Sequence, residues 1–268
     1  MKKSNKRLLY IVVGIIAFYL SNLIFVYFMQ EKLLFHPEVL TAGHAFNFDS
    51  DYEEVYIPVD KEVKLHGVLF KAKESKGLVF YLHGNGGSVN GRGKGTDEFT
   101  ALGYDLFILD YRGYGKSGGE LQSEAQMDAD MQKAFTFMAE KYKDKPIVVA
   151  GYSIGSGPAT ELAANNKIKA LILQAPYYSL TELIDTKVPF IPDFVKRYKF
   201  ETCSYIKKVT VPIYLFHGTD DKLIPISNSE RLVQLCAHGA HLIRLDGAGH
   251  NGLNENQTFR NSLKTILK

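Results

Sequence analysis

The first 29 residues combine a basic tail with one long apolar stretch. Residues 1–7 contain four lysine or arginine side chains, and residues 8–29 then run for 22 positions without a charge. As a helix, this stretch is long enough to cross about 30 Å of hydrocarbon. A cleaved signal peptide would have an apolar core of only about 7–15 residues followed by small residues, and a core helix would carry a polar face. The pattern therefore predicts an uncleaved transmembrane signal anchor over 8–29.

The basic residues also indicate how such an anchor is oriented. All four lie before the apolar stretch, whereas Glu31 and Lys32 follow it with no net charge. Because basic segments stay on the cytoplasmic side of a membrane, we expect the amino terminus in the cytoplasm. The rest of the chain, beginning with a linker over 30–51, is then expected on the extracytoplasmic side.

The remaining chain alternates between strand-like and helix-like patterns. Apolar and polar positions alternate over 54–59 and 63–71, which predicts an antiparallel hairpin. Short apolar runs, typical of strands buried on both faces, follow at 78–82, 105–110, 147–150, 170–173, 213–216 and 241–245. Helix-like stretches lie between them at 94–102, 123–142, 158–166, 227–237 and 254–267. This order predicts an α/β domain over 52–268, with a mostly parallel sheet covered by helices on both faces.

Composition and charge narrow the classes of function. Lys and Arg number 32 against 29 Asp and Glu, a net charge of +3 that is too balanced to indicate nucleic-acid binding. Two cysteines, Cys203 and Cys236, make neither a disulfide framework nor a zinc site. The histidines are scattered without the spacing of metal ligands. We therefore expect no metal, no cofactor and no nucleic-acid partner.

The stretch around Ser153 carries the strongest chemical signal. The apolar run 147–150 is followed by Gly151-Tyr-Ser-Ile-Gly155 and then by a helix-like segment. Strand, Gly-x-Ser-x-Gly and helix form the layout of a nucleophile elbow. A serine on so sharp a turn has a strained backbone, and side chains two residues to either side would collide with the neighbouring helix and strand. A glycine-rich turn that only reverses the chain is the alternative interpretation.

A serine nucleophile needs a histidine base on a loop that can reach it. The histidines downstream of Ser153 are His217, His238, His241 and His250. His250 lies between the last predicted strand and the last predicted helix, where a loop can extend to the elbow. His241 begins a strand and would point away, and His238 lies at a helix end. We interpret His217 as a hydrogen-bonded structural histidine.

The base in turn needs a carboxylate to orient it. Asp220 and Asp221 both follow the predicted strand 213–216, and either gives the chain order Ser, Asp, His that such elbows use. Two adjacent acidic side chains cannot both point inward, so one of them is expected to be a solvated loop charge. Periodicity leaves the choice between them open.

Acyl transfer also needs two donors for the oxyanion of its tetrahedral intermediate. One is expected to be the backbone N–H of Ile154, directly after the serine. The other is expected from the loop His83-Gly-Asn-Gly-Gly87, whose glycines allow a close approach to substrate. Within that loop we assign the N–H of Asn85.

Six stretches in order carry a resemblance to a known family. They are Leu-Leu-Phe-His-Pro (33–37), His-Gly-Asn-Gly-Gly (83–87), Asp-Tyr-Arg-Gly-Tyr-Gly-Lys-Ser (110–117), Gly-Tyr-Ser-Ile-Gly (151–155), His-Gly-Thr-Asp-Asp-Lys-Leu-Ile-Pro (217–225) and Gly-Ala-Gly-His-Asn (247–251). Through them the sequence resembles the α/β-hydrolase superfamily, and most of all its single-pass, membrane-anchored branch with lipase-like or serine aminopeptidase-like domains. The resemblance implies the α/β-hydrolase fold. Its His-Gly-x-x-Asp-x-x-Ile-Pro pattern falls on Asp221, makes Asp110 part of a structural turn, and makes residues 177–210 a short cap.

These expectations combine into a hypothesis of function. The sequence predicts a serine hydrolase of carboxylic ester or thioester bonds that works through an acyl-enzyme, with Ser153, Asp221 and His250 as catalytic residues. The membrane anchor and the apolar character of the cap favour acyl or lipid-borne substrates.

Two alternatives remain open at this point. A peptidase acting on small amino-terminal residues would use the same residues but would need an acidic anchor for the substrate ammonium, for which Glu182, Asp185 or Asp193 are available. A membrane-tethered interaction protein without catalysis is the second alternative, although proteins of that kind usually lack one member of the triad.

Overall fold

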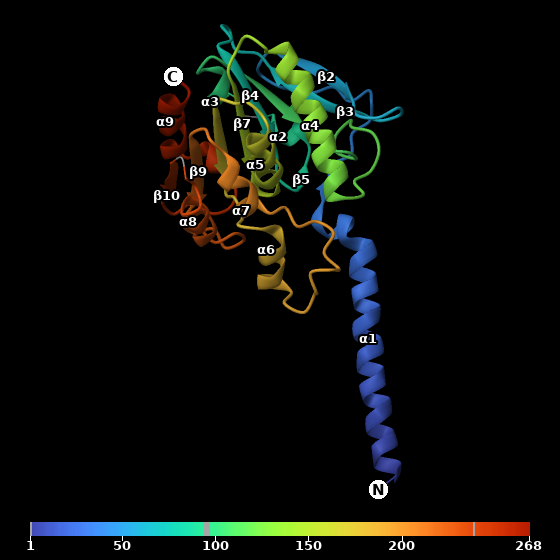
Figure 1. Cartoon of the computed structure of the whole chain (residues 1–268). Helices are drawn as coiled ribbons and strands as arrows, with labels where there is room; N and C mark the ends of the chain where they lie inside the picture. Colours follow the sequence, from blue (N-terminus) through green and yellow to red (C-terminus); the bar gives the residue numbers. More distant parts are fainter. Residues whose placement is uncertain (1, 94–96, 238) are drawn as a thin grey trace.

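The chain forms a long amino-terminal helix that projects from a body of alternating strands and helices (Figure 1). The computed structural model describes residues 2–93, 97–237 and 239–268. Helix α1 (Lys2–Leu34) includes a stretch, Asn5–Leu34, that is long and apolar enough to cross a membrane. The most apolar window of this stretch is not buried against the body. Helix α1 is therefore not a core helix of the domain.

An eight-stranded sheet organises the body, in the spatial order β10-β9-β8-β7-β4-β6-β3-β2. Strand β3 runs antiparallel to both of its neighbours, and the other neighbouring pairs are parallel. The strands are β2 (Tyr52–Pro58), β3 (Lys64–Phe70), β4 (Gly77–Leu82), β6 (Tyr104–Leu109), β7 (Ile147–Tyr152), β8 (Ala170–Gln174), β9 (Ile213–Gly218) and β10 (Ala240–Leu245). The predicted hairpin is β2–β3, and the predicted mostly parallel sheet is confirmed.

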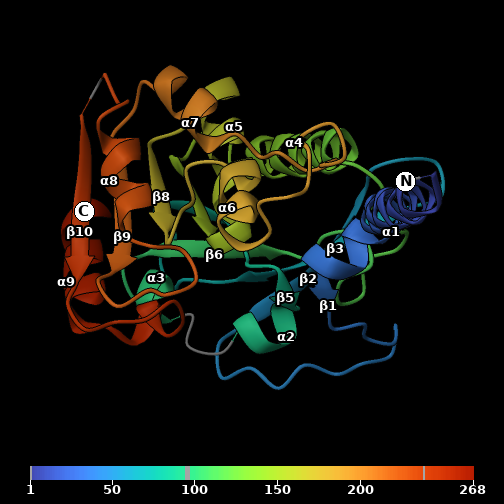
Figure 2. The same cartoon turned by 90° about the horizontal axis from the view of Figure 1, so that it is seen from below.

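Helices cover both faces of this sheet, as Figure 2 shows. Successive side chains of a strand point to opposite faces, so Phe80 belongs to one apolar core and Val79 to the other. Helices α4, α5 and α8 pack on the Phe80 side, and α2, α3 and α9 on the Val79 side. Their bounds are α2 (Val89–Arg92), α3 (Asp97–Thr100), α4 (Glu124–Lys141), α5 (Ser156–Asn165), α8 (Ser227–Val233) and α9 (Gln257–Ile266). The expected α/β class follows from two cores that share one sheet.

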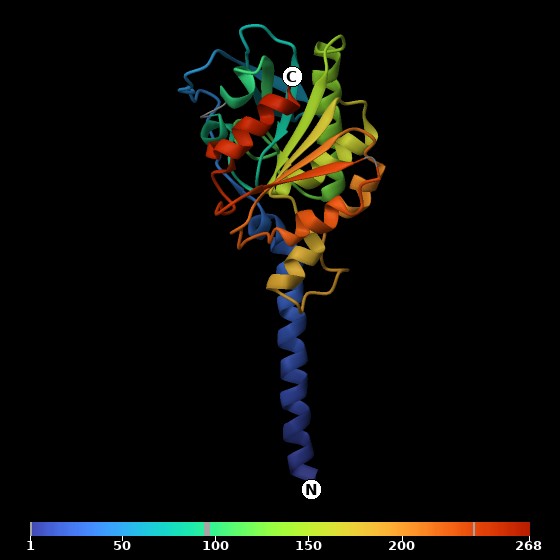
Figure 3. The ribbon, with the colours of Figure 1, turned by 90° about the vertical axis from the view of Figure 1, so that its left-hand side faces the viewer.

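The strand order places a crevice at the carboxyl ends of β4 and β7. The chain adds β6 on one side of β4 and then returns to add β7 on the other side. Loops that leave two such strands diverge, and ligands of open parallel sheets bind in the gap between them. The segment between β8 and β9 contains α6 (Leu180–Lys187) and α7 (Thr202–Tyr205), and α6 projects from this edge on the side where α1 leaves the body (Figures 1 and 3).

Several elements differ from the sequence-based expectations. The helix predicted over 94–102 is the single turn α3, and positions 94–96 lie outside the described residues, as does His238. The linker predicted over 30–51 is more regular than expected, because α1 continues to Leu34 and β1 (His36–Pro37) pairs with β5 (Gly86–Gly87). The last helix begins later than predicted, because the Asn256 side chain caps it by accepting the N–H of Thr258.

Candidate active site

The elbow has the strained geometry that its glycines predict. Ser153 follows β7 directly and has a φ of 52°, a left-handed conformation that costs a non-glycine residue about 1–3 kcal/mol. A Cβ on Gly151 would lie 2.5 Å from the carbonyl oxygen of Gly155 and 2.6 Å from the Cβ of Ala159 on α5. A Cβ on Gly155 would collide with the carbonyl oxygen of Leu82 at the end of β4. Only glycine at both positions lets the turn fit between helix and strand.

Three side chains from distant points of the chain meet at this turn. The Nε2 atom of His250 lies 2.9 Å from the Oγ atom of Ser153. The Nδ1 atom of the same ring lies 2.7 Å from Oδ2 of Asp221. His250 therefore lies within hydrogen-bond distance of both Ser153 and Asp221, and the three side chains follow in the order hydroxyl, imidazole, carboxylate.

Asp221 is held as a buried, ionised carboxylate. Its side chain is fully buried, and burial by itself would raise its pKa. Hydrogen bonds from His217, His250 and the backbone N–H of Ile224 outweigh burial and hold the pKa of Asp221 well below its usual range. The oxygen that does not face His250 accepts the N–H groups of Leu223 and Ile224, both at 2.9 Å. The carboxylate is thus fixed in position and charged at neutral pH.

The structure separates Asp221 from the competing candidates. Asp220 is exposed, as expected for a solvated loop charge, and its backbone N–H donates to the carbonyl of Ala248 at 3.0 Å. His217 is buried with Nδ1 2.7 Å from Ser229 Oγ and Nε2 2.8 Å from the carbonyl of Ile224, so it is the hydrogen-bonded histidine that the sequence predicts. His241 stacks on a tyrosine of the neighbouring strand β9. None of these groups approaches the serine.

The two backbone donors predicted for an oxyanion lie at the same place. Asn85 and Ile154 both line the cavity that contains Ser153. The carbonyl of Asn85 accepts the His36 N–H at 2.9 Å and the Tyr114 hydroxyl at 2.7 Å, which fixes this part of the loop. Among the described residues, no backbone acceptor is found for the N–H of Asn85 or of Ile154. The oxyanion role of these two N–H groups stays a prediction.

Asp110 contacts both ends of the loop that contains Asn85, and it does not contact Ser153 or His250. Its fully buried carboxylate accepts the N–H of Val89 at 2.8 Å. The rings of His66 and His83 lie 3.3 Å and 3.5 Å from its two oxygens. These contacts lower the pKa of Asp110 although burial alone would raise it. The role matches the structural turn that the family resemblance implies.

An apolar cavity of about 440 Å³ opens at Ser153. One wall comes from α6 and the loop after it, through Leu183 and Ile184, and Leu223 and Tyr177 contribute further apolar surface. The opposite wall comes from the end of α1, through Leu33 and Leu34. Sequence analysis did not assign this second wall. The sequence signal for this wall was the match of residues 33–37 to the family, and that match did not indicate a function for these residues.

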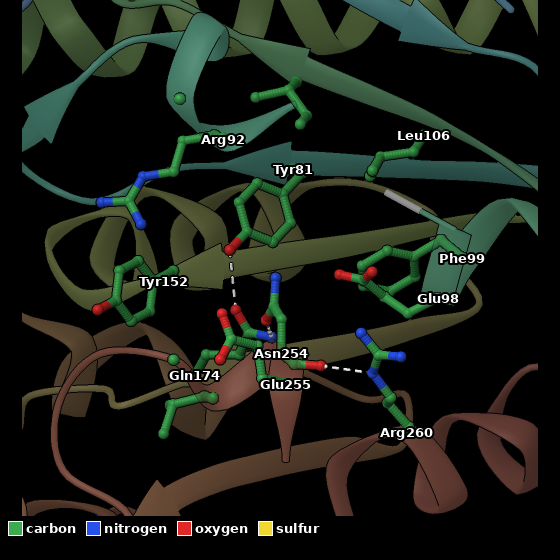
Figure 4. A pocket seen from close by; sticks show the side chains of 14 residues that line it. Tyr81, Arg92, Glu98, Phe99, Leu106, Tyr152, Gln174, Asn254, Glu255 and Arg260 are labelled. Carbon is green, nitrogen blue, oxygen red and sulfur yellow. Dashed lines mark hydrogen bonds between the residues drawn. The ribbon is translucent and has the colours of Figure 1, made fainter. Parts of the chain in front are cut away.

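A second, smaller cavity of about 220 Å³ lies on the other face of the sheet (Figure 4). Tyr152 lines it, so consecutive elbow residues face different cavities. A chain of hydrogen bonds runs from the Tyr81 hydroxyl to Gln174 and from Gln174 to Asn254, each at 2.8 Å. The Tyr152 hydroxyl lies 2.9 Å from the carbonyl of His250. This cavity thus contacts the loop that carries the histidine, but not the serine.

The acidic residues that a peptidase would need are already paired with cations of this chain. Glu182 forms two hydrogen bonds with Arg231. Asp185 and Asp193 both pair with Lys196, whose side chain is buried. Each carboxylate that could hold a substrate ammonium is therefore occupied by a partner within the chain.

Comparison with known proteins places the chain in a family. Residues 73–200 match the family described as "Serine aminopeptidase, S33". The chain is 32% identical to protein bem46 of Schizosaccharomyces pombe over 227 residues, which cover 78% of this chain and 76% of that protein. It is 30% identical to human alpha/beta hydrolase domain-containing protein 17B over 202 residues, which cover 72% of this chain and 67% of that protein.

Solved structures show the same fold. The Pyrococcus furiosus esterase Pf2001 matches with a TM-score of 0.68 at 20% identity, over 87% of this chain and 94% of that chain. Est1E from Butyrivibrio proteoclasticus matches with a TM-score of 0.63 at 19% identity, over 79% and 96%. With the sequence relatives, these likenesses confirm the family resemblance and the fold. The chain belongs to the α/β-hydrolase superfamily and is a hydrolase.

Proposed function

We propose that this protein is a membrane-anchored serine hydrolase that cleaves carboxylic ester or thioester bonds of apolar acyl groups. Ser153 is the nucleophile, His250 the general base and Asp221 the residue that orients the base. The observation that carries the proposal is the hydrogen-bonded series from Ser153 Oγ through His250 to Asp221 at the mouth of an apolar cavity. The N–H groups of Asn85 and Ile154 are the proposed oxyanion donors.

The reaction follows from these positions. Ser153 Oγ attacks the acyl carbonyl carbon while its proton moves to Nε2 of His250. The Nδ1–H of the imidazolium donates to Asp221, which stabilises the positive charge. The carbonyl oxygen becomes an oxyanion that accepts the N–H groups of Asn85 and Ile154. Collapse of this intermediate expels an alcohol or thiol, which takes the proton from Nε2. Water then attacks the acyl-enzyme by the same steps and releases the acid.

The shape of the cavity supports an apolar acyl group. Each methylene that moves from water into such a cavity gains about 0.8 kcal/mol. A cavity of about 440 Å³ is within the usual size range of small-molecule sites. Its walls are mainly aliphatic, from Leu33, Leu183 and Ile184 among others, which favours a hydrocarbon chain over a polar group.

Helix α1 supports a location at the membrane. Its apolar stretch is exposed, and four basic residues precede this stretch in the sequence. The proposed orientation therefore has the amino terminus in the cytoplasm and the hydrolase body on the extracytoplasmic side. A signal sequence near the amino terminus can also form a long apolar helix. Carbonate extraction of membranes and amino-terminal sequencing of the recovered protein distinguish an anchor from a cleaved leader.

An ester or thioester substrate is favoured over a peptide with a free amino terminus. Such a peptide needs an unpaired carboxylate near the serine, whereas Glu182, Asp185 and Asp193 are each in an ion pair. Comparing the hydrolysis of p-nitrophenyl esters with that of aminoacyl-nitroanilides separates the two activities, and the esters are expected to react faster.

Activity-based labelling of the full chain in detergent tests the proposal. A fluorophosphonate probe is expected to label the natural chain at the activated serine. The bond that it forms is stable and is not hydrolysed, so the label stays on the protein. The Ser153→Ala variant is expected to lose labelling and to lose about 10⁴-fold or more of its esterase activity. Ser204→Ala, which changes an exposed serine on α7, is the matched control and is expected to label normally. Labelling that persists in Ser153→Ala would assign the nucleophile to another residue.

A further inference from the structure

The loop after α6 is attached to the long amino-terminal helix. This loop, residues 188–194, is called the cap loop below. The hydroxyl of Tyr19 donates to the carbonyl of Phe190 at 2.8 Å. Gln30, which is buried, donates to the carbonyl of Val195 and accepts the N–H of Arg197, both at 2.8 Å. The cap is therefore fixed along α1 from the middle of the helix to its last turns (Figures 1 and 3).

These contacts fix the height of the cap loop relative to a membrane. Tyr19 lies eleven residues before Gln30, which corresponds to about 16 Å of helix. If residues 8–29 cross about 30 Å of hydrocarbon, Tyr19 lies near the bilayer centre. A loop bonded to Tyr19 then lies beside the membrane-spanning part of the helix. It lies within the leaflet on the side of the body.

The surface of the cap loop suits a hydrocarbon environment. Phe190 is 77% exposed and Phe194 is 82% exposed, and Val188 beside them is 47% exposed. Pro189 and Pro192 have no N–H that would need a partner in lipid. These side chains are on the outside of the protein.

Charged groups around the loop are arranged for a lipid boundary. Asp193, the only charged residue of the loop, is paired with Lys196 at 2.8 Å. Lys187 and Lys199 are exposed and flank the loop in the sequence. Basic side chains that flank an inserted loop can contact lipid phosphates, since their stems can lie along apolar surface.

The cavity at Ser153 lies between the same two elements. Val26 and Leu33 of α1 line one side, and Ile184, Val188 and Ile191 of the cap line the other. A cavity bounded by a membrane helix on one side and an inserted loop on the other adjoins the leaflet. An acyl chain can then pass from lipid to the serine while it stays in apolar surroundings.

We propose that the cap loop inserts into the leaflet that faces the hydrolase body, and that acyl substrates enter the cavity from this leaflet between α1 and α6. The partner of this surface is a lipid bilayer, and the substrate is a lipid-borne acyl ester or thioester. The route for substrate rests on the proposed function, whereas the insertion of the loop does not. Two measurements therefore test the insertion and the substrate route separately.

The first measurement is depth by fluorescence quenching in vesicles. The chain contains no tryptophan, so Phe190→Trp and Phe194→Trp each introduce a single probe. In phosphatidylcholine vesicles that contain the full chain, bromine atoms on the lipid acyl chains are expected to quench both variants strongly. Phe137→Trp, at an exposed position of α4 on the body, is the matched control and is expected to be quenched little.

The outcomes of this measurement are distinct. Absence of quenching in both cap-loop variants would overturn the insertion. A blue-shifted emission without quenching would mean that a second copy of the chain covers the loop instead, which also overturns it. Strong quenching in a chain that a fluorophosphonate fails to label would keep the insertion and remove the proposed function.

The second measurement tests the substrate route. The double variant Phe190→Ser, Phe194→Ser changes side chains that do not line the cavity. It is expected to hydrolyse p-nitrophenyl palmitate dissolved in vesicles at least tenfold more slowly than the natural chain. Its hydrolysis of water-soluble p-nitrophenyl butyrate is expected to stay within twofold. Equal rates on vesicle-borne palmitate would overturn entry from the leaflet, and an equal loss on both esters would do so as well.

Discussion

Two cavities flank the elbow, and they differ in chemistry. The cavity at Ser153 is mainly aliphatic and has a volume of about 440 Å³, whereas the cavity behind Tyr152 is polar and about half that size (Figure 4). Because successive residues of a strand face opposite sides, one strand end supplies a residue to each cavity. In the apolar cavity the backbone N–H groups of Asn85 and Ile154 have no backbone acceptor among the described residues. In the polar cavity Tyr81, Gln174 and Asn254 are joined by hydrogen bonds between their side chains.

The polar cavity braces the loop that carries the histidine. The Tyr152 hydroxyl bridges the carbonyl of His250 and the side chain of Asn251. The guanidinium of Arg92 lies 5.0 Å above the Tyr152 ring, and Arg260 bonds to the carbonyl of Asn254. The proposed catalytic site therefore lies on one face of the sheet, and the residues that hold the His250 loop in place lie on the other. Changes on the aliphatic side should alter catalysis and selectivity, and changes on the polar side should alter stability.

The largest effect is expected at the carboxylate that orients the histidine. Asp221→Asn is expected to lower kcat by about 10⁴-fold, because an amide in place of the carboxylate favours the wrong imidazole tautomer. Asp220→Asn changes an exposed neighbour and is expected to keep kcat within twofold. Steady-state hydrolysis of p-nitrophenyl butyrate measures both. Equal losses in the two variants would contradict the assignment of Asp221.

The next effect is a pH dependence of stability from the polar cavity. Burial raises the pKa of Glu98 from its usual 4.5 to about 7, and no partner is found for its Oε2 among the described residues. The folded chain therefore favours the protonated carboxyl. Its stability should fall as the pH rises from about 4.5 through about 7, by about 2–3 kcal/mol in total.

Glu98→Gln is the variant that checks this prediction. It replaces the carboxyl by a neutral group of similar shape, so this part of the pH dependence is expected to disappear. Urea unfolding of the full chain in detergent at pH 5 and pH 8 measures the difference in the free energy of unfolding. An unchanged pH dependence in the variant would assign the effect to another group.

A smaller effect is expected from filling the aliphatic cavity. Ile184→Trp adds volume to the wall opposite α1 and is expected to exclude long acyl chains. The ratio of kcat/KM for p-nitrophenyl butyrate to that for the dodecanoate should rise about tenfold, since about two methylenes lose about 0.8 kcal/mol each. Glu98→Gln, in the polar cavity, serves as the control and should leave this ratio unchanged.

The smallest effect is expected from the hydroxyl that joins the two sides. Tyr152→Phe removes its contacts to the His250 loop and should cost about 1 kcal/mol of stability, with a loss of activity of only a few-fold. Thermal unfolding and kcat measure the two consequences. Tyr56→Phe removes an exposed hydroxyl bonded to Glu54 and should change neither. If Tyr56→Phe lost as much stability as Tyr152→Phe, the result would contradict the proposal that Tyr152 stabilises the His250 loop.

Much of the candidate site was predictable because its signals are local. The strand before Ser153, the two glycines of the elbow and the loop around His250 are each visible in a few consecutive residues. The choice of Asp221 over Asp220 was not local. It came from the family pattern, and the structure supplies the physical reason, since only Asp221 is buried against both His217 and His250.

The elements that sequence analysis missed depend on distant contacts. Strand β1 exists because His36–Pro37 pairs with the glycines after β4, and two residues carry no pattern of their own. Helix α6 is too short to produce a clear period, and it is joined to α8 by the ion pair between Glu182 and Arg231. The wall of the aliphatic cavity likewise needs residues 26–34 and 180–191 to meet in space.

The sequence by itself determined the order of strands and helices, the elbow at Ser153 and the apolar stretch of α1. Each depends on the spacing of apolar, glycine and charged residues within one segment, because local backbone conformation is set by residues that are near one another in the sequence. Only the tertiary structure decided what lines the two cavities and where the cap loop lies along α1. Those outcomes depend on which side chains become buried together, and burial is a property of the whole folded chain.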